Sequence, residues 1–358
     1  MKTLQRQRGV AVITALLLTT LAISIVASLF WQQQVQVRSM ENQRLHLQTK
    51  WILRGALDWA TLVLRQDGYD HVRYTSLDHV WATPLAETRL DQYIERERVA
   101  GENFNATLSG NIIDACSRYN LTNLARDRQL LPDQVMVFRR LLQNLQLDQG
   151  LAERTARFVA AAQPPAAAPD VTGNGNGSDN GNDNGNGNGN GNGNGNGNGN
   201  GRGNGNGAGV AQVTRAPSTT MQLLQVDDLL AIPGFNQAMV DKLRPFVIVL
   251  PMQAPVNVNT APPEVLAAVL PKMSLSGANA LLARRKQAPW DDFMKFRTEM
   301  NEEDLSADVA DVKSSWFLVD SRIQLDRAAL NAESLVYRPL GGFGLTVGNT
   351  RVVWTRQN

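Results

Sequence analysis

The chain contains very little cysteine and histidine. Its 358 residues include one cysteine, Cys116, and three histidines, His46, His71 and His79. A single cysteine cannot form a disulfide within the chain, and we expect Cys116 to be buried as a small apolar residue. The histidines do not stand with cysteines at the spacings of zinc sites. We therefore predict structural or surface roles for them, and no metal site.

An excess of charge of one sign is also missing. The 35 Lys and Arg residues nearly balance the 33 Asp and Glu residues, and the net charge is +2. Such a balance argues against a protein built to attract polyanions. The sequence has no Ser/His/Asp grouping, no metal-ligand cluster and no Gly-rich loop that leads into Lys-Ser or Lys-Thr. We predict that the protein is not an enzyme.

Charged side chains are absent from residues 10–31, which are 22 mostly apolar residues. A helix of that length crosses a hydrocarbon core of ~30 Å. Lys2, Arg6 and Arg8 precede it, so the positive-inside rule places the N-terminus in the cytoplasm and the bulk of the chain on the far side. We predict a single membrane span. A cleaved secretory signal and an unprocessed signal anchor are the alternatives.

The start of this stretch resembles the class III leader of pilin-like proteins, in which Arg-Gly is followed directly by an apolar helix. The resemblance implies cleavage by prepilin peptidase between Gly9 and Val10, and N-methylation of Val10. Most pilins carry Glu at the fifth mature position, where this chain has Thr14. Burying a carboxylate inside a membrane is energetically unfavourable, so such a group is kept where it pairs with a group of a partner subunit. A subunit that enters a filament first has no such partner, and absence of the Glu is typical of the type II secretion system protein K family.

Helical periodicity continues past the membrane stretch. We predict one helix from Val10 to about Leu64, ~80 Å long at ~1.5 Å per residue. Its first half would lie in lipid or in a filament core, and its second half would pack on a globular domain. Residues 67–70 have the composition of a turn. The apolar stripe expected to face the domain consists of Leu45, Ile52, Ala56, Trp59 and Val63.

Strand-like sequence occurs in two regions separated by roughly 200 residues. Residues 104–108 and 112–115, joined by a turn at 109–111, predict a β-hairpin. Because further strands are expected only near the C-terminus, one antiparallel sheet is interrupted by an inserted domain. The C-terminal candidates are 316–319, 322–325, 332–337 and 347–354.

The insert is expected to be helical, with helices at 133–147 and 150–162. It opens with Asn-Leu-Thr-Asn-Leu at 120–124, which resembles the Asn-Leu-Asn-Asn-Leu of the protein K family. Alternating Gly-Asn at 173–207 has almost nothing to bury, so we predict a disordered loop there. In the family an acidic segment associated with calcium occupies this place. We therefore predict no cofactor, and leave calcium as an open alternative.

Two segments of the insert, 229–235 and 256–271, resemble helix-hairpin-helix units. DNA binding by that motif needs Gly-hydrophobic-Gly in the hairpin, so that backbone N–H groups can approach a phosphate. The corresponding residues here are Gly-Phe-Asn at 234–236 and Lys-Met-Ser at 272–274. Between 221 and 300 there are 8 Lys and Arg against 7 Asp and Glu. We predict a packing or protein-interaction module and no nucleic acid, with a membrane-tethered DNA receptor as the alternative.

The predicted fold class is α+β. A pilin-like long N-terminal helix packs on a small antiparallel sheet, and a large all-α, SAM-like domain is inserted in that sheet. The expected segments are a cleaved leader (1–9), the membrane half (10–31) and periplasmic half (32–66) of the helix, a loop with the first strands (67–117), the first part of the insert (118–171), the Gly-Asn tract (172–209), the second part of the insert (210–312) and the C-terminal strands (313–358).

The resemblance to the protein K family implies a minor pseudopilin at the tip of the type II secretion pseudopilus. Such a subunit initiates and caps the filament that drives export of folded proteins across the outer membrane. The implied partners are other minor pseudopilins, the major pseudopilin, prepilin peptidase and the inner membrane. A minor pilin of a type IV pilus is an alternative with the same mechanics.

Overall fold

The structure, a computed structural model, describes residues 10–90, 105–164, 221–340 and 350–357. The predicted leader at 1–9 and the Gly-Asn tract at 172–209 lie outside the described residues.

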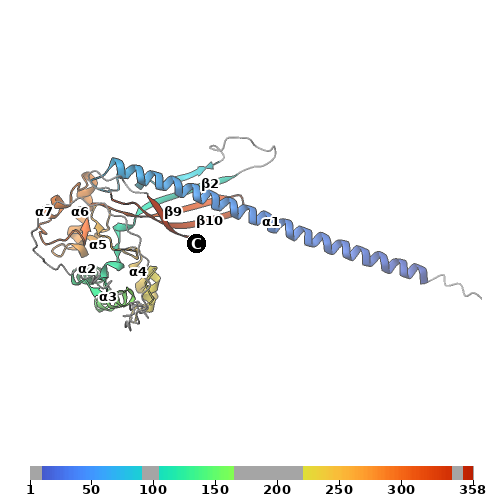
Figure 1. Cartoon of the computed structure of the whole chain (residues 1–358), viewed down its shortest axis with the longest axis horizontal. Helices are drawn as coiled ribbons and strands as arrows, with labels where there is room; N and C mark the ends of the chain where they lie inside the picture. Colours follow the sequence, from blue (N-terminus) through green and yellow to red (C-terminus); the bar gives the residue numbers. More distant parts are fainter. Residues whose placement is uncertain (1–9, 91–104, 165–220, 341–349, 358) are drawn as a thin grey trace, which may run out of the picture.

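A single helix, α1 (Val10–Asp70), forms the shaft of the molecule (Figure 1). Its 61 residues correspond to ~90 Å at ~1.5 Å per residue. The predicted unbroken helix is confirmed, but the predicted turn at 67–70 is wrong, because α1 continues through it. The last turns are held helical by a hydrogen bond from Gln66 Nε2 to Asp70 Oδ1 at 3.0 Å and by complete burial of Leu64.

The N-terminal half of α1 has no packing partner within the described chain. In that part of the chain, α1 is the one helix long and apolar enough to cross a membrane, and none of its most apolar stretch is buried. Leu18 and Ile23, for example, are 66% and 68% exposed. Folded proteins rarely leave so much contiguous apolar surface in water. A membrane anchor fits this half of the helix.

The C-terminal half of α1 lies along a five-stranded antiparallel sheet of order β1-β2-β9-β10-β11 (Figure 1). The central pair joins distant parts of the sequence, because β2 runs beside β9 from Ala106 opposite Leu325 to Asp114 opposite Phe317. This pairing confirms the predicted interruption of the sheet by an insert. The strands are β1 (Leu85–Arg89), β2 (Ala106–Asp114), β9 (Trp316–Leu325), β10 (Ala328–Tyr337) and β11 (Arg351–Gln357).

The predicted hairpin at 104–115 is wrong, because β2 is one continuous strand. Its nine consecutive residue pairs with β9 outweigh the local turn preference of residues 109–111. A Cβ atom on Gly110 would lie 2.3 Å from the carbonyl oxygen of Asp320, so this glycine serves the close approach of two strands and not a turn. The predicted strands at 316–319 and 322–325 are likewise the two halves of β9.

One face of α1 packs on the sheet through Leu53, Leu57, Ala60 and Leu64, which are buried. The predicted stripe is displaced from this face by about one residue, and its member Trp59 is 51% exposed. Burial of each leucine contributes about 1.5–3 kcal/mol of transfer free energy. The core is completed by side chains of the 3₁₀ turn η1 (Val80–Ala82), β9 and β10, namely Trp81, Phe317, Val319, Ile323, Leu330, Ala332 and Val336.

The described residues between β2 and β9 form a mainly helical domain beside the C-terminal end of α1 (Figure 1). The helix predicted at 150–162 is confirmed as α3, and the one predicted at 133–147 is confirmed as α2, which ends three residues earlier than predicted, at Asn144. The helices are α2 (Pro132–Asn144), α3 (Gly150–Ala162), α4 (Gln237–Leu243), α5 (Pro263–Val269), α6 (Leu275–Gln287) and α7 (Phe293–Glu299). Three two-stranded pairs accompany them: β3 (Tyr119–Asn120) with β6 (Val247–Ile248), β4 (Ala125–Arg126) with β5 (Gln129–Leu130), and β7 (Val256–Asn257) with β8 (Ala310–Asp311).

The Asn-Leu-Thr-Asn-Leu motif braces the two sequence halves of this domain against each other. Asn120 Oδ1 accepts from the backbone N–H of Leu250 at 3.0 Å, and its Nδ2 donates to the carbonyl of Met252 at 2.9 Å. Asn123 exchanges two hydrogen bonds with the backbone of Ala254, at 2.8 and 3.1 Å. Each buried amide therefore satisfies main-chain groups more than 120 residues away.

Candidate functional site

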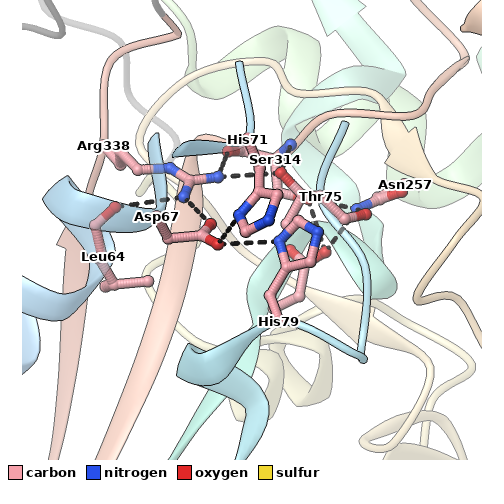
Figure 2. A network of polar contacts seen from close by, with 9 residues as sticks. Leu64, Asp67, His71, Thr75, His79, Asn257, Ser314 and Arg338 are labelled. Atoms are coloured by element: carbon pink, nitrogen blue, oxygen red, sulfur yellow. Dashed lines mark hydrogen bonds and ion pairs between the residues drawn. The ribbon is translucent and has the colours of Figure 1, made fainter. Parts of the chain in front are cut away.

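The end of α1, the loop that follows it and the residue after β10 meet in a buried polar cluster (Figure 2). Arg338 lies at its centre and is 3% exposed. Its Nη1 donates to the carbonyl of Leu64 at 3.2 Å and to Asp67 Oδ2 at 2.5 Å. Its Nη2 donates to Thr75 Oγ1 at 2.9 Å and to the carbonyl of Ser314 at 3.1 Å. One side chain thus ties together the helix, the loop and the chain returning from the insert.

Asp67 is the counter-charge in this cluster. Burial by itself raises the pKa of the Asp67 carboxyl, but the approach of His79 and the hydrogen bond and charge of Arg338 outweigh burial and hold the pKa below its usual value. A buried ion pair is tolerated only when both partners are well hydrogen-bonded, as they are here. The pair therefore fixes geometry at the end of α1.

Two histidines share the second oxygen of Asp67. Nδ1 of His71 and Nδ1 of His79 each lie 2.9 Å from Asp67 Oδ1, and the two rings stack at 3.8 Å. From the sequence we expected structural or surface roles for these histidines and no metal site. The structure instead brings together Asp67, His71 and His79, whose ligand atoms lie within 4.8 Å of one another. The one signal in the sequence was the four-residue spacing of Asp67 and His71, which is about one helical turn.

A second buried carboxylate, Asp114, joins the insert to the sheet at the end of β2. Its Oδ1 accepts from the backbone N–H of Cys116 at 2.8 Å, and its Oδ2 accepts from Asn257 Nδ2 at 2.9 Å and from the hydroxyls of Thr260 and Ser314 at 2.6 Å each. Burial raises the pKa of Asp114, and these donors oppose the rise. Cys116 is buried, as predicted, and burial raises the pKa of its thiol to about 12. Because Ser314 belongs to both clusters, the two networks are continuous.

The side of α1 that faces away from the sheet is a separate candidate surface, which we call the outer stripe: Met40, Leu47, Trp51 and Leu62. These side chains are 62%, 57%, 67% and 50% exposed. At ~100° per residue they fall within about 60° of one another and roughly opposite the face that packs on the sheet. An exposed apolar stripe of this kind is typical of an interaction surface.

The two loops that resemble helix-hairpin-helix hairpins are occupied by internal contacts. Between α5 and α6, the backbone N–H of Lys272 donates to Glu302 Oε1 at 3.2 Å, so a carboxylate takes the donor that a phosphate would need. In the other loop, a Cβ atom on Gly234 would lie 2.3 Å from Arg154 Nη1, which also donates to the carbonyl of Pro233. These contacts agree with a packing role.

The residues predicted to direct processing are placed only in part. Lys2, Arg6, Arg8 and Gly9 lie outside the described residues. Val10 is the first residue of α1, and Thr14 follows one turn later on the unpacked half of the helix. Their predicted roles stay predictions.

Comparison with known proteins adds independent evidence. A family model for type II secretion system (T2SS), protein K matches residues 256–319. Type II secretion system protein K of Pseudomonas aeruginosa is 30% identical over 96% of this chain and 96% of its own length. The corresponding protein of Pectobacterium carotovorum is 23% identical over 93% of both chains, and that of Klebsiella pneumoniae is 25% identical over 98% of both.

The fold agrees as well. The crystal structure of a GspK–GspI–GspJ complex from the enterotoxigenic Escherichia coli type 2 secretion system contains a chain that matches with a TM-score of 0.59 and 17% sequence identity. The match covers 89% of this chain and 99% of that one. By its sequence over nearly its whole length, and in agreement with its fold, this chain belongs to the type II secretion system protein K family of minor pseudopilins.

Proposed function

We propose that the protein occupies the tip of the type II secretion pseudopilus, where it initiates the filament and caps it. The supporting observation is the position of the insert, which enters between β2 and β9 and lies at the end of α1 that is remote from the apolar half (Figure 1). In a filament of parallel α1 helices, the next subunit would have to place its sheet in that space. A domain of this size leaves no room for a subunit above it.

The outer stripe supplies the contact with the subunits below. It presents Trp51 and three aliphatic or thioether side chains on the face that the sheet does not cover. Aromatic anchors of this kind dominate the energy of many interfaces. The solved relative was crystallised with GspI and GspJ. We infer that the outer stripe packs on the corresponding minor pseudopilins of this system, and that the major pseudopilin follows them.

Membrane insertion precedes assembly. Residues 10–31 would anchor the chain in the inner membrane, with Lys2, Arg6 and Arg8 in the cytoplasm and the sheet and insert in the periplasm. Prepilin peptidase would then cut between Gly9 and Val10, and Val10 would be N-methylated. With Thr14 in place of Glu, packing would be driven by apolar contacts and not by a charge pair in the membrane. The role is structural and involves no catalysis.

The tip position can be tested on pseudopili that are overproduced at the cell surface. With an epitope inserted in the Gly-Asn tract, gold-labelled antibody should mark one end of each filament, because a capping subunit occurs once per filament. The matched control is the same epitope on the major pseudopilin, which should be marked along the whole length. Label from the tip subunit distributed along the filament would contradict the proposal.

The leader assignment makes a separate prediction. Gly9→Ala should leave the chain in the membrane and about 1 kDa heavier than the wild type, because nine residues of roughly 110 Da stay attached. Secretion of exoproteins should fall. Immunoblots of membrane fractions measure the mass difference, and Arg8→Lys, which keeps the positive charge, serves as the control. Normal processing of Gly9→Ala would refute the cleavage site.

A further inference from the structure

We propose that Asp67, His71 and His79 form a binding site for a divalent transition-metal ion, for which zinc is the best match. Each residue offers one ligand atom, and these atoms lie within 4.8 Å of one another. Figure 2 shows both imidazole rings beside the same carboxylate, with Nδ1 of each 2.9 Å from Asp67 Oδ1. The carboxylate comes from the last turn of α1, and the histidines come from the loop that follows it.

An unsatisfied buried group points to a ligand in the same place. The side chain of His79 is 2% exposed, and neither of its ring nitrogens makes a properly aligned hydrogen bond to the described residues, despite the short distance to Asp67. Leaving a buried polar group without a partner costs about 1–3 kcal/mol. A metal ion bound through Nδ1 would satisfy one of the two unpartnered ring nitrogens and remove its share of that cost.

The surroundings of Asp67 hold the carboxylate in a metal-binding orientation. Arg338 donates to Oδ2 at 2.5 Å, which leaves Oδ1 directed at the two imidazoles. Hydrogen bonds of this kind to the distal oxygen commonly orient a ligating carboxylate. The charge of Arg338 opposes a nearby cation, but Asp67 lies between the two and screens that repulsion.

The donor set selects the class of metal. Two imidazole nitrogens and one carboxylate oxygen suit zinc and similar transition metals, whereas calcium and magnesium prefer oxygen donors alone. Ligand atoms around a tetrahedral zinc ion are about 3.4 Å apart, so the pairs now at 2.9 Å must widen by about 0.5 Å. His71 can supply this adjustment, because it lies outside the helix and its side chain is 38% exposed. The same exposure leaves the fourth position open to water.

A bound ion would stabilise the connection between α1 and the inserted domain. It would connect the end of α1 to the loop that leads into η1, whose Trp81 is part of the core between α1 and the sheet. The same loop is tied to the insert, because the backbone N–H of Thr75 donates to the carbonyl of Val312 at 2.8 Å. The ion would therefore stiffen the connection between α1 and the insert.

The test uses the full chain in detergent micelles after treatment with a chelator. Zn²⁺ binding is measured by calorimetry, and Co²⁺ is the spectroscopic probe, because tetrahedral Co²⁺ with nitrogen ligands absorbs strongly in the visible range. The wild type should bind about one ion per chain and melt at a higher temperature with Zn²⁺. His71→Ala should weaken binding by about tenfold or more. His46→Ala is the matched control, since His46 is exposed on α1 and precedes Asp67 by about six helical turns.

The histidine variants distinguish a metal site from a cluster that binds no metal. His79→Ala should also weaken binding by about tenfold or more. Because His79 is buried, its replacement can also disturb the fold, so the partly exposed His71 is the decisive variant. Loss of binding and of the thermal shift in His71→Ala, with both retained in His46→Ala, supports the site. Equal binding by His71→Ala and the wild type, or no binding by the wild type, would overturn it. The cluster would then be an aspartate that holds two histidines without a metal. A calcium titration of the wild type should leave Co²⁺ binding unchanged.

Discussion

Replacing Arg338 by methionine is expected to lower the free energy of unfolding by about 3–5 kcal/mol, because it leaves the Asp67 carboxylate buried without its counter-charge. The change also removes donors to Leu64, Thr75 and Ser314. Denaturant unfolding of the full chain in micelles, followed by tryptophan fluorescence, measures the loss. The free energy of unfolding of Arg338→Lys should lie between those of the wild type and Arg338→Met. A lysine keeps the counter-charge, but its ammonium cannot reach all four acceptors at once.

A surface ion pair supplies the control for this prediction. Arg327 donates to Glu41 on α1 at 3.0 Å, but both side chains are more than half exposed. Arg327→Met should therefore cost less than about 1 kcal/mol. If Arg338→Met were as mild as Arg327→Met, the buried cluster would not hold the end of α1 to the sheet.

Replacing Trp51 by glutamate is expected to leave the fold intact and to weaken assembly with the other minor pseudopilins by about 30-fold or more. Trp51 is 67% exposed, so little of the protein's own packing is lost. Loss of an aromatic anchor at the centre of an interface costs about 2 kcal/mol or more, which corresponds to that factor. Co-purification with the minor pseudopilins and secretion of an exoprotein are the two measurements.

Lys50→Glu is the matched control for this variant. It places a carboxylate at the neighbouring exposed position, about a quarter of a turn from the centre of the outer stripe. Thermal melting of both variants should equal that of the wild type. Normal assembly of Trp51→Glu would show that the outer stripe is not the contact surface, and equal defects in both variants would point to a general effect of charge.

The two apolar faces of α1 explain why the sequence located the helix but not its buried side. Leu53, Leu57, Ala60 and Leu64 face the sheet, while the outer stripe faces away from it, and flanking residues such as Trp59 lie between. Periodicity reports that apolar residues recur, but not which face is covered within the chain and which is left for a partner. The sheet supplies that distinction only once it has formed.

The predicted hairpin failed for a related reason. The turn signal at Ser109-Gly110-Asn111 is local, whereas β9 comes from a part of the chain roughly 200 residues later. Nine backbone pairs with β9 outweigh the preference of three residues for a turn. The Asp67, His71 and His79 cluster was missed in the same way, because it depends on how the chain turns back after α1.

The sequence by itself determined the apolar span, the long helix, the insertion within one sheet and the family resemblance, because each depends on local composition, spacing or motif. Only the tertiary structure decided which face of α1 is buried and that 106–114 is one strand. It also decided that Arg338 ties the end of α1 to the chain returning from the insert, and that Asp114 joins the insert to the sheet. Those features depend on contacts between residues far apart in the chain, where burial and pairing outweigh the preferences of any short segment.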